Sequence, residues 1–356
     1  MKLPARYEKV GTPFSGGGMS TAFKCKDKHL DRHVLVKVLQ QGVDQKRILD
    51  EVKALSAIRS KHVVQIYDVL KDGAGAVTAL VEEFLPGQDL NELVPIKDAS
   101  VFLRHLYAIA CGLADIHAVG VVHRDIKPNN MKVDAEGCLH IFDFGLSRTD
   151  GVNCETIGTI GTLGYIAPEL CVPAHQKVNF TSAVDVFAFG ATALKLVRGK
   201  LPSDLRAIPP NLPVVDADFA KQALTLPPEI ATVLNQCLSK KPTKRPSMET
   251  IRDIVGRHLL HGRHKATMIA GDKIHYLEKI GQSVKLSAGS LGSVNVIYDG
   301  YDFIATNVIG DVYVNNMGIT PPQNFPGACV ITLGAPSLGF HREYITFDVT
   351  HPEVVL

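Results

Sequence analysis

The sequence lacks paired cysteines, a strong net charge and any long uninterrupted hydrophobic run. Its seven cysteines are scattered singly with no CxxC pair, which indicates reduced thiols rather than a disulfide framework or a cysteine-based zinc site. No apolar run approaches the roughly 18 residues that a membrane-spanning helix needs, and the N-terminal MKLPARYEKV has no apolar signal core. We therefore expect a cytoplasmic protein without a membrane span.

The charge balance is nearly even, at a formal net charge of +2. Nothing in this balance demands nucleic acid or an anionic membrane as a partner, and we expect no nucleic-acid partner. A hydrophobic content of 46% and a charged content of 21% suit a globular protein with a substantial core. The 356 residues exceed one typical domain, so we expect two domains.

The first part of the chain mixes strand-like runs with helical patterns. VLVKVL (34–39) is rich in β-branched residues, and ALVEEFL (79–85) follows the turn KDGAGA. Between these two runs, four apolar residues recur at helical spacing: Ile48, Val52, Leu55 and Ile58. From about 99 to 260 the pattern is mostly helical, and SAVDVFAFGATALKLVRGK is apolar nearly all round, which predicts a buried helix.

The character of the sequence changes near residue 262. Short runs such as SVNVIY, DFIATNV and EYITFDV then alternate with Gly, Asn and Pro turns, which favours an all-β sandwich. From 264 onward five Lys and Arg stand against eight Asp and Glu, so this part is acidic and the remainder is basic. The junction RHLLHGRHK places three histidines three residues apart, and we interpret it as a solvated linker in preference to a metal site.

Several charged residues are of the types that phosphate and metal chemistry requires. HRDIKPNN supplies Asp125, Lys127 and Asn130, while IFDFGLS supplies Asp143 and VLVKVL supplies Lys37 on a strand. Phosphoryl transfer depends on positioning, on charge stabilisation and on a group that accepts or orients the proton of the attacking hydroxyl. Carboxylate and amide oxygens are also suitable ligands for a hard cation.

These motifs resemble, in order, those of the eukaryotic-like (bacterial-type) Ser/Thr protein kinases, together with IAPE (166–169) and RPS (245–247). The resemblance implies an α+β bilobal kinase fold over residues 5–260, with a β-rich N-lobe to about 85 and a helical C-lobe from about 86. An all-β domain would follow over 264–356. It also implies transfer of the γ-phosphate of ATP to Ser or Thr hydroxyls of protein substrates, with Mg²⁺ or Mn²⁺ as the metal ion.

Carried over to this sequence, the resemblance implies catalytic and metal-binding roles. Asp125 would accept or orient the substrate hydroxyl proton, and Lys127 would steady the γ-phosphate. Asn130 and Asp143 would hold magnesium. Thr162, five residues before the alanine of IAPE, would lie in the substrate pocket.

The resemblance also implies nucleotide contacts. Lys37 would bind the α- and β-phosphates while paired with Glu51, and PFSGGGMSTAF would cover the phosphates, although serines replace two of the family's glycines. Glu82 takes the place of a usually apolar gatekeeper, and Lys132 that of the apolar floor beneath adenine, so we expect a slightly polar pocket. The remaining ATP-binding residues are Gly17, Gly18, Glu83 and Leu85.

Further roles implied by the family are structural or regulatory. Glu169 and Arg245 would form a buried ion pair, and Asp185 would tie the catalytic loop to the buried helix. Arg124 before the catalytic aspartate implies control by a phosphorylated activation segment. We expect autophosphorylation at Thr156 and Thr159 in that segment.

Two alternatives to an active protein kinase differ in function class. A small-molecule phosphotransferase of kinase-like fold would not be expected to carry GTLGYIAPE together with Arg245. A catalytically weak pseudokinase would act as a scaffold through the C-terminal domain, but such proteins usually lose Lys37, Asp125 or Asp143, and all three are present.

The C-terminal region faintly resembles the closing strands of forkhead-associated domains, which bind phosphothreonine. The resemblance lies in VYVNNMGITPPQNFPGACVITLG and REYITFDVTHPEV. The phosphate-contacting arginine and the serine-x-x-histidine of that family are not evident, so we interpret the region as a degenerate sandwich. Of two possible roles, binding a phosphopeptide and serving as a docking or self-association surface, we favour the second.

Overall fold

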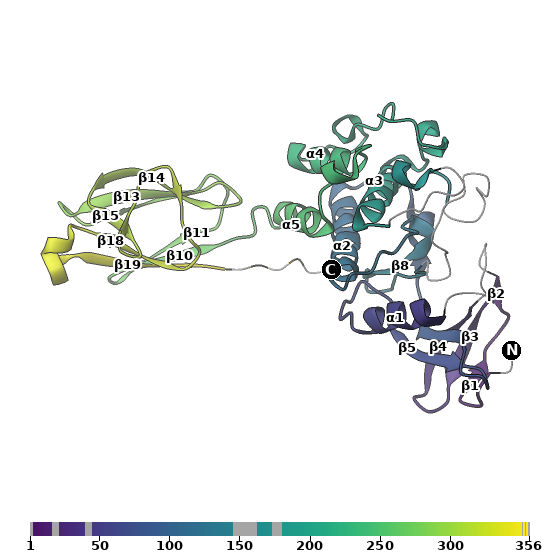
Figure 1. Cartoon of the computed structure of the whole chain (residues 1–356). Coiled ribbons are helices and arrows are strands. Elements are labelled where there is room, and N and C mark those ends of the chain that lie inside the picture. The colour runs from purple at the N-terminus through teal and green to yellow at the C-terminus, as the bar shows by residue number, and fades with distance from the viewer. Residues whose placement is uncertain are drawn as a thin grey trace. The chain divides into compact units, whose positions relative to one another are not determined.

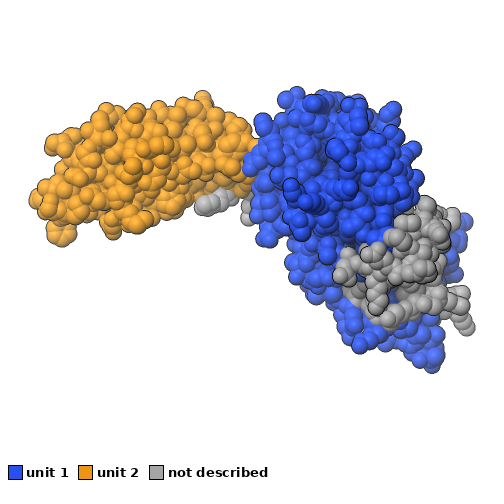
Figure 2. Space-filling model, turned by 45° about the horizontal axis from the view of Figure 1, so that its top comes forward, with its two compact units in different colours: residues 1–255, 356 blue, residues 256–355 orange. Residues whose placement is uncertain are grey.

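The structure is a computed structural model of the chain. It describes residues 3–15, 21–39, 45–144, 162–172, 180–350, 352 and 354, without the side chains of Phe14, Ser15, Arg47 and Glu51. The described chain forms two compact units, residues 1–255 and 256–355 (Figure 2). The division falls within helix α5 (Met248–Leu259), whereas the change in sequence character comes just after that helix ends.

The first unit begins with an antiparallel sheet of strand order β1-β3-β4-β6-β5, in which β2 pairs with β3. Its strands are β1 (Tyr7–Lys9), β2 (Phe14–Ser15), β3 (Thr21–Asp27), β4 (Arg32–Val38), β5 (Ile66–Lys71) and β6 (Val77–Glu83). Val34 and Val36 of β4 are fully buried in the core on one face of the sheet. Because side chains alternate along a strand, Leu35 and Lys37 point to the opposite face.

Helix α1 (Gln45–Ser56) packs against β5 (Figure 1). The helical stripe expected from the sequence is confirmed, since all four of its apolar residues are at most 5% exposed: Ile48, Val52, Leu55 and Ile58. Ile58 lies just beyond the end of the helix. The β-rich N-terminal part that the resemblance implied is therefore present.

The rest of the first unit is mainly helical and carries a small three-stranded sheet. Its helices are α2 (Ala99–Ala118), α3 (Ser182–Arg198), α4 (Pro228–Cys237) and α5. The small sheet consists of β7 (Gln88–Asp89), β8 (Met131–Val133) and β9 (Leu139–Ile141). Helix α3 is buried along most of its length, as its apolar sequence predicts, and ends at Gly199, whose φ of 77° is the left-handed conformation that glycine favours.

Short 3₁₀ segments complete both units. They are η1 (Leu90–Leu93), η2 (Pro128–Asn130), η4 (Pro168–Leu170), η5 (Ser203–Arg206), η6 (Phe219–Lys221), η7 (Pro242–Lys244) and η8 (Pro336–His341). Among the described helices, only α2 is long and apolar enough to cross a membrane. The same helix packs against α3 and β9 and buries nine residues, which is the behaviour of a core helix.

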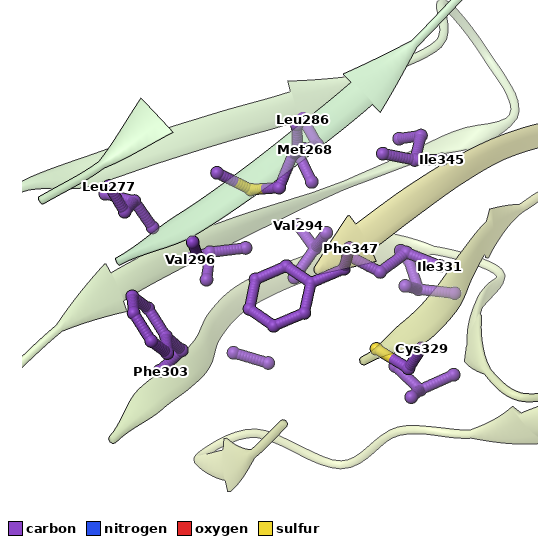
Figure 3. Close-up of a cluster of buried hydrophobic side chains, with 14 of the residues drawn as sticks. Met268, Leu277, Leu286, Val294, Val296, Phe303, Cys329, Ile331, Ile345 and Phe347 are labelled. Carbon is purple, nitrogen blue, oxygen red and sulfur yellow. The ribbon is translucent and has the colours of Figure 1, made fainter. Parts of the chain in front are cut away.

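The second unit contains two antiparallel sheets that enclose one hydrophobic core (Figure 3). One sheet has the order β11-β10-β19-β18-β15-β16 and the other the order β12-β13-β14-β17. The strands are β10 (Ala266–Ala270), β11 (Lys273–Leu277), β12 (Ser283–Ser287), β13 (Gly292–Tyr298), β14 (Phe303–Gly310), β15 (Val312–Val314), β16 (Met317–Gly318), β17 (Gln323–Asn324), β18 (Cys329–Leu333) and β19 (Glu343–Val349). The predicted all-β domain is therefore present, and its resemblance to forkhead-associated domains stays a prediction.

Two histidines of the junction, His258 and His261, contact Tyr301. His258 Nδ1 lies 2.7 Å from the Tyr301 hydroxyl, and the His261 ring is 4.4 Å from the Tyr301 ring. The turn at 260–263 therefore belongs to the second unit, while His261 and Arg263 remain exposed to solvent. The six cysteines within the described part of the chain are free thiols, as predicted.

Candidate active site

The segment HRDIKPNN is held in place by a buried carboxylate of helix α3. Asp185 is 1% exposed, and it accepts hydrogen bonds from the backbone N–H groups of His123 (2.8 Å) and Arg124 (2.9 Å). His117 Nε2 of α2 donates a third hydrogen bond to the same carboxylate, at 2.9 Å. Charge-assisted hydrogen bonds of this kind are stronger than neutral ones, so Asp185 fixes the backbone that leads into Asp125.

Two non-glycine residues beside the site adopt left-handed backbone conformations. Arg124 has a φ of 71° and Asp143 a φ of 64°. Such conformations cost on the order of 1–3 kcal/mol each and persist only where surrounding contacts enforce them. The hydrogen bond from the Arg124 N–H to Asp185 is one such contact.

The Asp125 carboxylate lies at the centre of a polar cluster and is itself buried. Its Oδ2 accepts hydrogen bonds from Lys127 Nζ at 2.8 Å and from Asn130 Nδ2 at 2.9 Å. Thr162 Oγ1 donates to Asp125 Oδ1 at 3.4 Å and accepts from Lys127 Nζ at 2.5 Å. The structure thus gathers an acceptor, a cation and a hydroxyl-bearing side chain around one point.

Asp143 is brought next to this cluster by backbone hydrogen bonds. The Phe142 N–H donates to the Asn130 carbonyl at 3.0 Å, and the Phe142 carbonyl accepts from His123 Nε2 at 3.1 Å. The Asp143 carboxylate forms an ion pair with Lys37 of β4. Asn130 Nδ2 donates to the Asp125 carbonyl and to the Asp125 carboxylate, which leaves the amide oxygen Oδ1 to act as a metal ligand.

A cavity of about 540 Å³ runs from these residues toward the end of β6, within the size range of small-molecule sites. Glu83 and Leu85 line it, together with Lys37 and Asp143. Lys132 lines it as well, and its ammonium lies 3.7 Å from an Asp89 carboxylate oxygen. The predicted nucleotide-contacting residues that the structure describes therefore share one cavity.

Glu82 also lines this cavity, although it is only 4% exposed. It pairs across the sheet with Leu35, so the two side chains share the cavity face of the sheet with Lys37. Burial raises the pKa of the Glu82 carboxyl, an effect that the positive charge of Lys37 opposes. The slightly polar pocket expected from the sequence is thus built with a buried carboxyl at its wall.

His123 is a functional residue that the sequence analysis did not single out. It is fully buried, its Nε2 bonds to the Phe142 carbonyl, and its Nδ1 accepts from the Asp125 N–H at 3.3 Å. Burial lowers the pKa of this imidazole, and the neutral ring can donate and accept at once. Its place as the first residue of HRD is the sequence signal that would have identified it.

The predicted ion pair between Glu169 and Arg245 is bidentate. The two guanidinium nitrogens of Arg245 donate to the two Glu169 carboxylate oxygens at 2.6 and 2.8 Å, and the Arg245 side chain is fully buried. Arg245 also donates to the carbonyls of Ala183 and Ser239. It therefore joins the 167–170 segment to the first turn of α3 and to the segment after α4.

Several predicted site residues cannot be placed. Gly17, Gly18, Thr156 and Thr159 lie outside the described residues. Glu51 lies in α1, but its side chain is outside the described part, so its pairing with Lys37 stays a prediction.

Comparison with known proteins agrees with this geometry. Residues 7–255 match the protein kinase domain model. Among similar proteins, a "Probable serine/threonine-protein kinase" of Clostridium acetobutylicum is 31% identical over 264 residues, which are 68% of this chain and 38% of that protein. A serine/threonine-protein kinase of Corynebacterium efficiens is 35% identical over 199 residues, which are 52% of this chain and 38% of that protein. PknL of Mycobacterium tuberculosis is 30% identical over 258 residues, which are 68% of this chain and 63% of that protein.

The chain spans well under half the length of the first two of these relatives. The matched region nevertheless covers residues 7–255 of the first unit, including every described residue of the cavity and of the Asp125 cluster. Proteins of this family use ATP and a divalent metal ion. The chain belongs to the protein kinase family.

Proposed function

We propose that this chain is an ATP-dependent serine/threonine protein kinase with Mg²⁺ as its metal ion. The observation that carries the proposal is the cluster in which Asp125 contacts Lys127, Asn130 and Thr162, together with the separate cavity that Lys37 and Asp143 line. A pseudokinase scaffold is not supported, because the groups needed for transfer lie together. A small-molecule phosphotransferase is not favoured by the intact Glu169–Arg245 pair.

The donor set suits a hard divalent cation. Asn130 offers its amide oxygen and Asp143 its carboxylate, which is 45% exposed toward the cavity, and oxygen ligands of this kind suit Mg²⁺. When bound, the ion neutralises charge on the phosphates of ATP. Lys37, now paired with Asp143, is placed to exchange that contact for phosphate oxygens.

Each residue of the cluster then has its own role in phosphoryl transfer. Asp125 accepts or orients the proton of the attacking hydroxyl, and its position is fixed by Asn130 from one side and Lys127 from the other. Lys127 also places a positive charge where the transferring phosphoryl group gains negative charge. Thr162 lies next to both, so an incoming serine or threonine side chain would approach beside it.

Transfer from γ-labelled ATP in the presence of Mg²⁺ tests the proposal, followed by identification of the labelled amino acid. The chain is expected to place label on serine or threonine of itself or of a basic protein substrate. Lys37→Met should abolish labelling, while Lys53→Met, an exposed lysine of α1, should leave it unchanged. Equal labelling by the wild type and Lys37→Met would overturn the proposal, as would label confined to tyrosine.

We further propose autophosphorylation at Thr156 and Thr159, supported by the position of Arg124 directly before Asp125. Arg124 is the residue that a phosphate on the activation segment would neutralise. Mass spectrometry of active protein should find phosphate on both threonines. Unmodified threonines in fully active protein would contradict this.

For the second unit we propose self-association through one face of its larger sheet. Three exposed aliphatic side chains lie in one row across neighbouring strands on this face. Ile274 of β11 pairs with Ile269 of β10, and Thr346 of β19 lies between Ile269 and Val330 of β18. An exposed apolar row of this kind favours a protein contact. Analytical ultracentrifugation should show that the wild type sediments as an oligomer and that Ile269→Lys sediments as a monomer. A wild type that is monomeric would contradict the proposal. Phosphopeptide binding has no comparable support among the described residues.

A further inference from the structure

The β8–β9 hairpin carries a cluster of side chains that the kinase reaction does not use. Asp134 follows β8, Cys138 precedes β9 and His140 lies within β9. Their carboxylate oxygen, sulfur and ring nitrogen all lie within 4.8 Å of one another. Oxygen, sulfur and nitrogen donors thus converge from a single turn of the chain.

The Asp134 carboxylate is oriented by the backbone of the turn. Its Oδ1 accepts hydrogen bonds from the N–H groups of Glu136 at 3.1 Å and Cys138 at 2.7 Å. Its Oδ2 lies 2.9 Å from His140 Nε2, and the Asp134 and His140 side chains are only 18% and 14% exposed. A carboxylate and an imidazole that are fixed in this way lose little freedom when they bind an ion.

His62 closes one side of the cluster. It is 2% exposed, and its Nδ1 lies 2.8 Å from the Leu139 carbonyl and 3.7 Å from Cys138 Sγ. His140 Nδ1 and His62 Nε2 are among the buried side-chain atoms of the described chain that have no hydrogen-bond partner. Each imidazole therefore has one ring nitrogen whose bonding capacity is unused.

The charges of the donor set match a divalent cation. A coordinated thiol loses its proton, so Cys138 would bind the ion as a thiolate. One thiolate and one carboxylate then balance the two positive charges of the ion.

We propose that Asp134, Cys138 and His140 form a binding site for a zinc-class transition-metal ion, separate from the magnesium site at Asn130 and Asp143. Mixed Cys, His and Asp ligands are typical of Zn²⁺ and Co²⁺, whereas magnesium avoids sulfur. Three protein ligands leave the fourth tetrahedral position to water. Binding forms a metal–sulfur bond and releases the thiol proton of Cys138 to solvent.

The test uses all 356 residues of the chain, freed of metal with a chelator and then supplied with saturating Mg²⁺ to occupy the hard-cation site. Titration with Co²⁺ should produce a cobalt–thiolate charge-transfer absorption that saturates at one equivalent. Cys138→Ser should abolish this absorption, while Cys111→Ser, at a partly buried thiol of α2, should retain it. His140→Gln should weaken Co²⁺ binding at least about tenfold.

Thermal unfolding provides a second readout that does not depend on the spectrum. Zn²⁺ should raise the unfolding temperature of the wild type and of Cys111→Ser, but not that of Cys138→Ser. The proposal is overturned if the wild type shows no charge-transfer absorption, or if the absorption survives Cys138→Ser. In that event the Asp134–His140 contact is only a hydrogen bond that stabilises the hairpin.

Discussion

Replacing Asp185 with asparagine tests how the catalytic loop is held. In the wild type, Oδ2 accepts from His117 Nε2 and the His123 N–H, and Oδ1 accepts from the Arg124 N–H. Asparagine has one carbonyl oxygen, so in either orientation at least one buried backbone N–H faces an NH₂ group. A buried donor left without an acceptor costs about 1–3 kcal/mol, and the charge-assisted character of the lost bond adds to this.

We therefore expect Asp185→Asn to lower the free energy of unfolding of the first unit by about 2–4 kcal/mol. Because Arg124 is in a left-handed conformation, loss of its anchor should also let the backbone before Asp125 relax. A displacement of about 1 Å at a reacting group can reduce kcat roughly 100-fold, so kcat should fall more than the KM for ATP changes.

Urea unfolding and steady-state phosphoryl transfer measure the two effects. Asp253→Asn is the matched control, because that carboxylate is 63% exposed on α5 and its loss should change the free energy of unfolding by less than about 0.5 kcal/mol. The reasoning is refuted if Asp185→Asn matches Asp253→Asn in both stability and kcat.

Three further predictions concern other parts of the first unit. Arg245→Met should lower the free energy of unfolding, measured by urea unfolding, by about 3–5 kcal/mol. Adding Glu169→Gln should recover part of this loss, because it removes the charge that Arg245→Met leaves unpaired. If the double variant loses the sum of the two single losses in free energy of unfolding, the prediction is contradicted. Glu82→Met should lower the Kd for ATP by about three- to tenfold in calorimetric titration, because it replaces a buried carboxyl in the cavity wall with an apolar side chain; weaker binding would show that the carboxyl contributes to recognition. Asp27, whose pKa is lowered to about 2 chiefly by its hydrogen bond to Arg6, should contribute stability above about pH 4 that is lost as the pH falls toward 2. The difference in unfolding temperature between the wild type and Asp27→Asn should close across that window, and a constant difference would contradict this.

The sequence alone predicted the elements that depend on residues close together in the chain. The helical spacing of the α1 stripe, the apolar surface of α3 and the alternating short runs after 262 each predicted the right kind of structure. The ordered motifs predicted that Asp125, Lys127, Asn130 and Asp143 belong to one site. These predictions succeed because periodicity and short motifs are properties of neighbouring residues.

Contacts between distant segments could not be predicted in the same way. The tie between Asp185 and the catalytic loop was expected from the family resemblance alone. Its particular donors, His117 and the backbone of His123, lie more than 60 positions away, and no spacing rule identifies them. The proximity of Asp134, Cys138 and His140 depends on the turn between β8 and β9, and their contact with His62 depends on a separate segment. The packing of His258 and His261 on Tyr301 was missed because histidines near a change in composition resemble a solvated linker.

Single-turnover phosphoryl transfer by Asp125→Asn is the most direct test of the catalytic centre. At saturating ATP and Mg²⁺, the rate of transfer to a serine or threonine hydroxyl should fall about 10²–10⁴-fold relative to the wild type, while the Kd for ATP stays within about twofold. An unchanged transfer rate with an unchanged Kd would show that Asp125 does not act on the attacking hydroxyl, and the proposed catalytic centre would be contradicted.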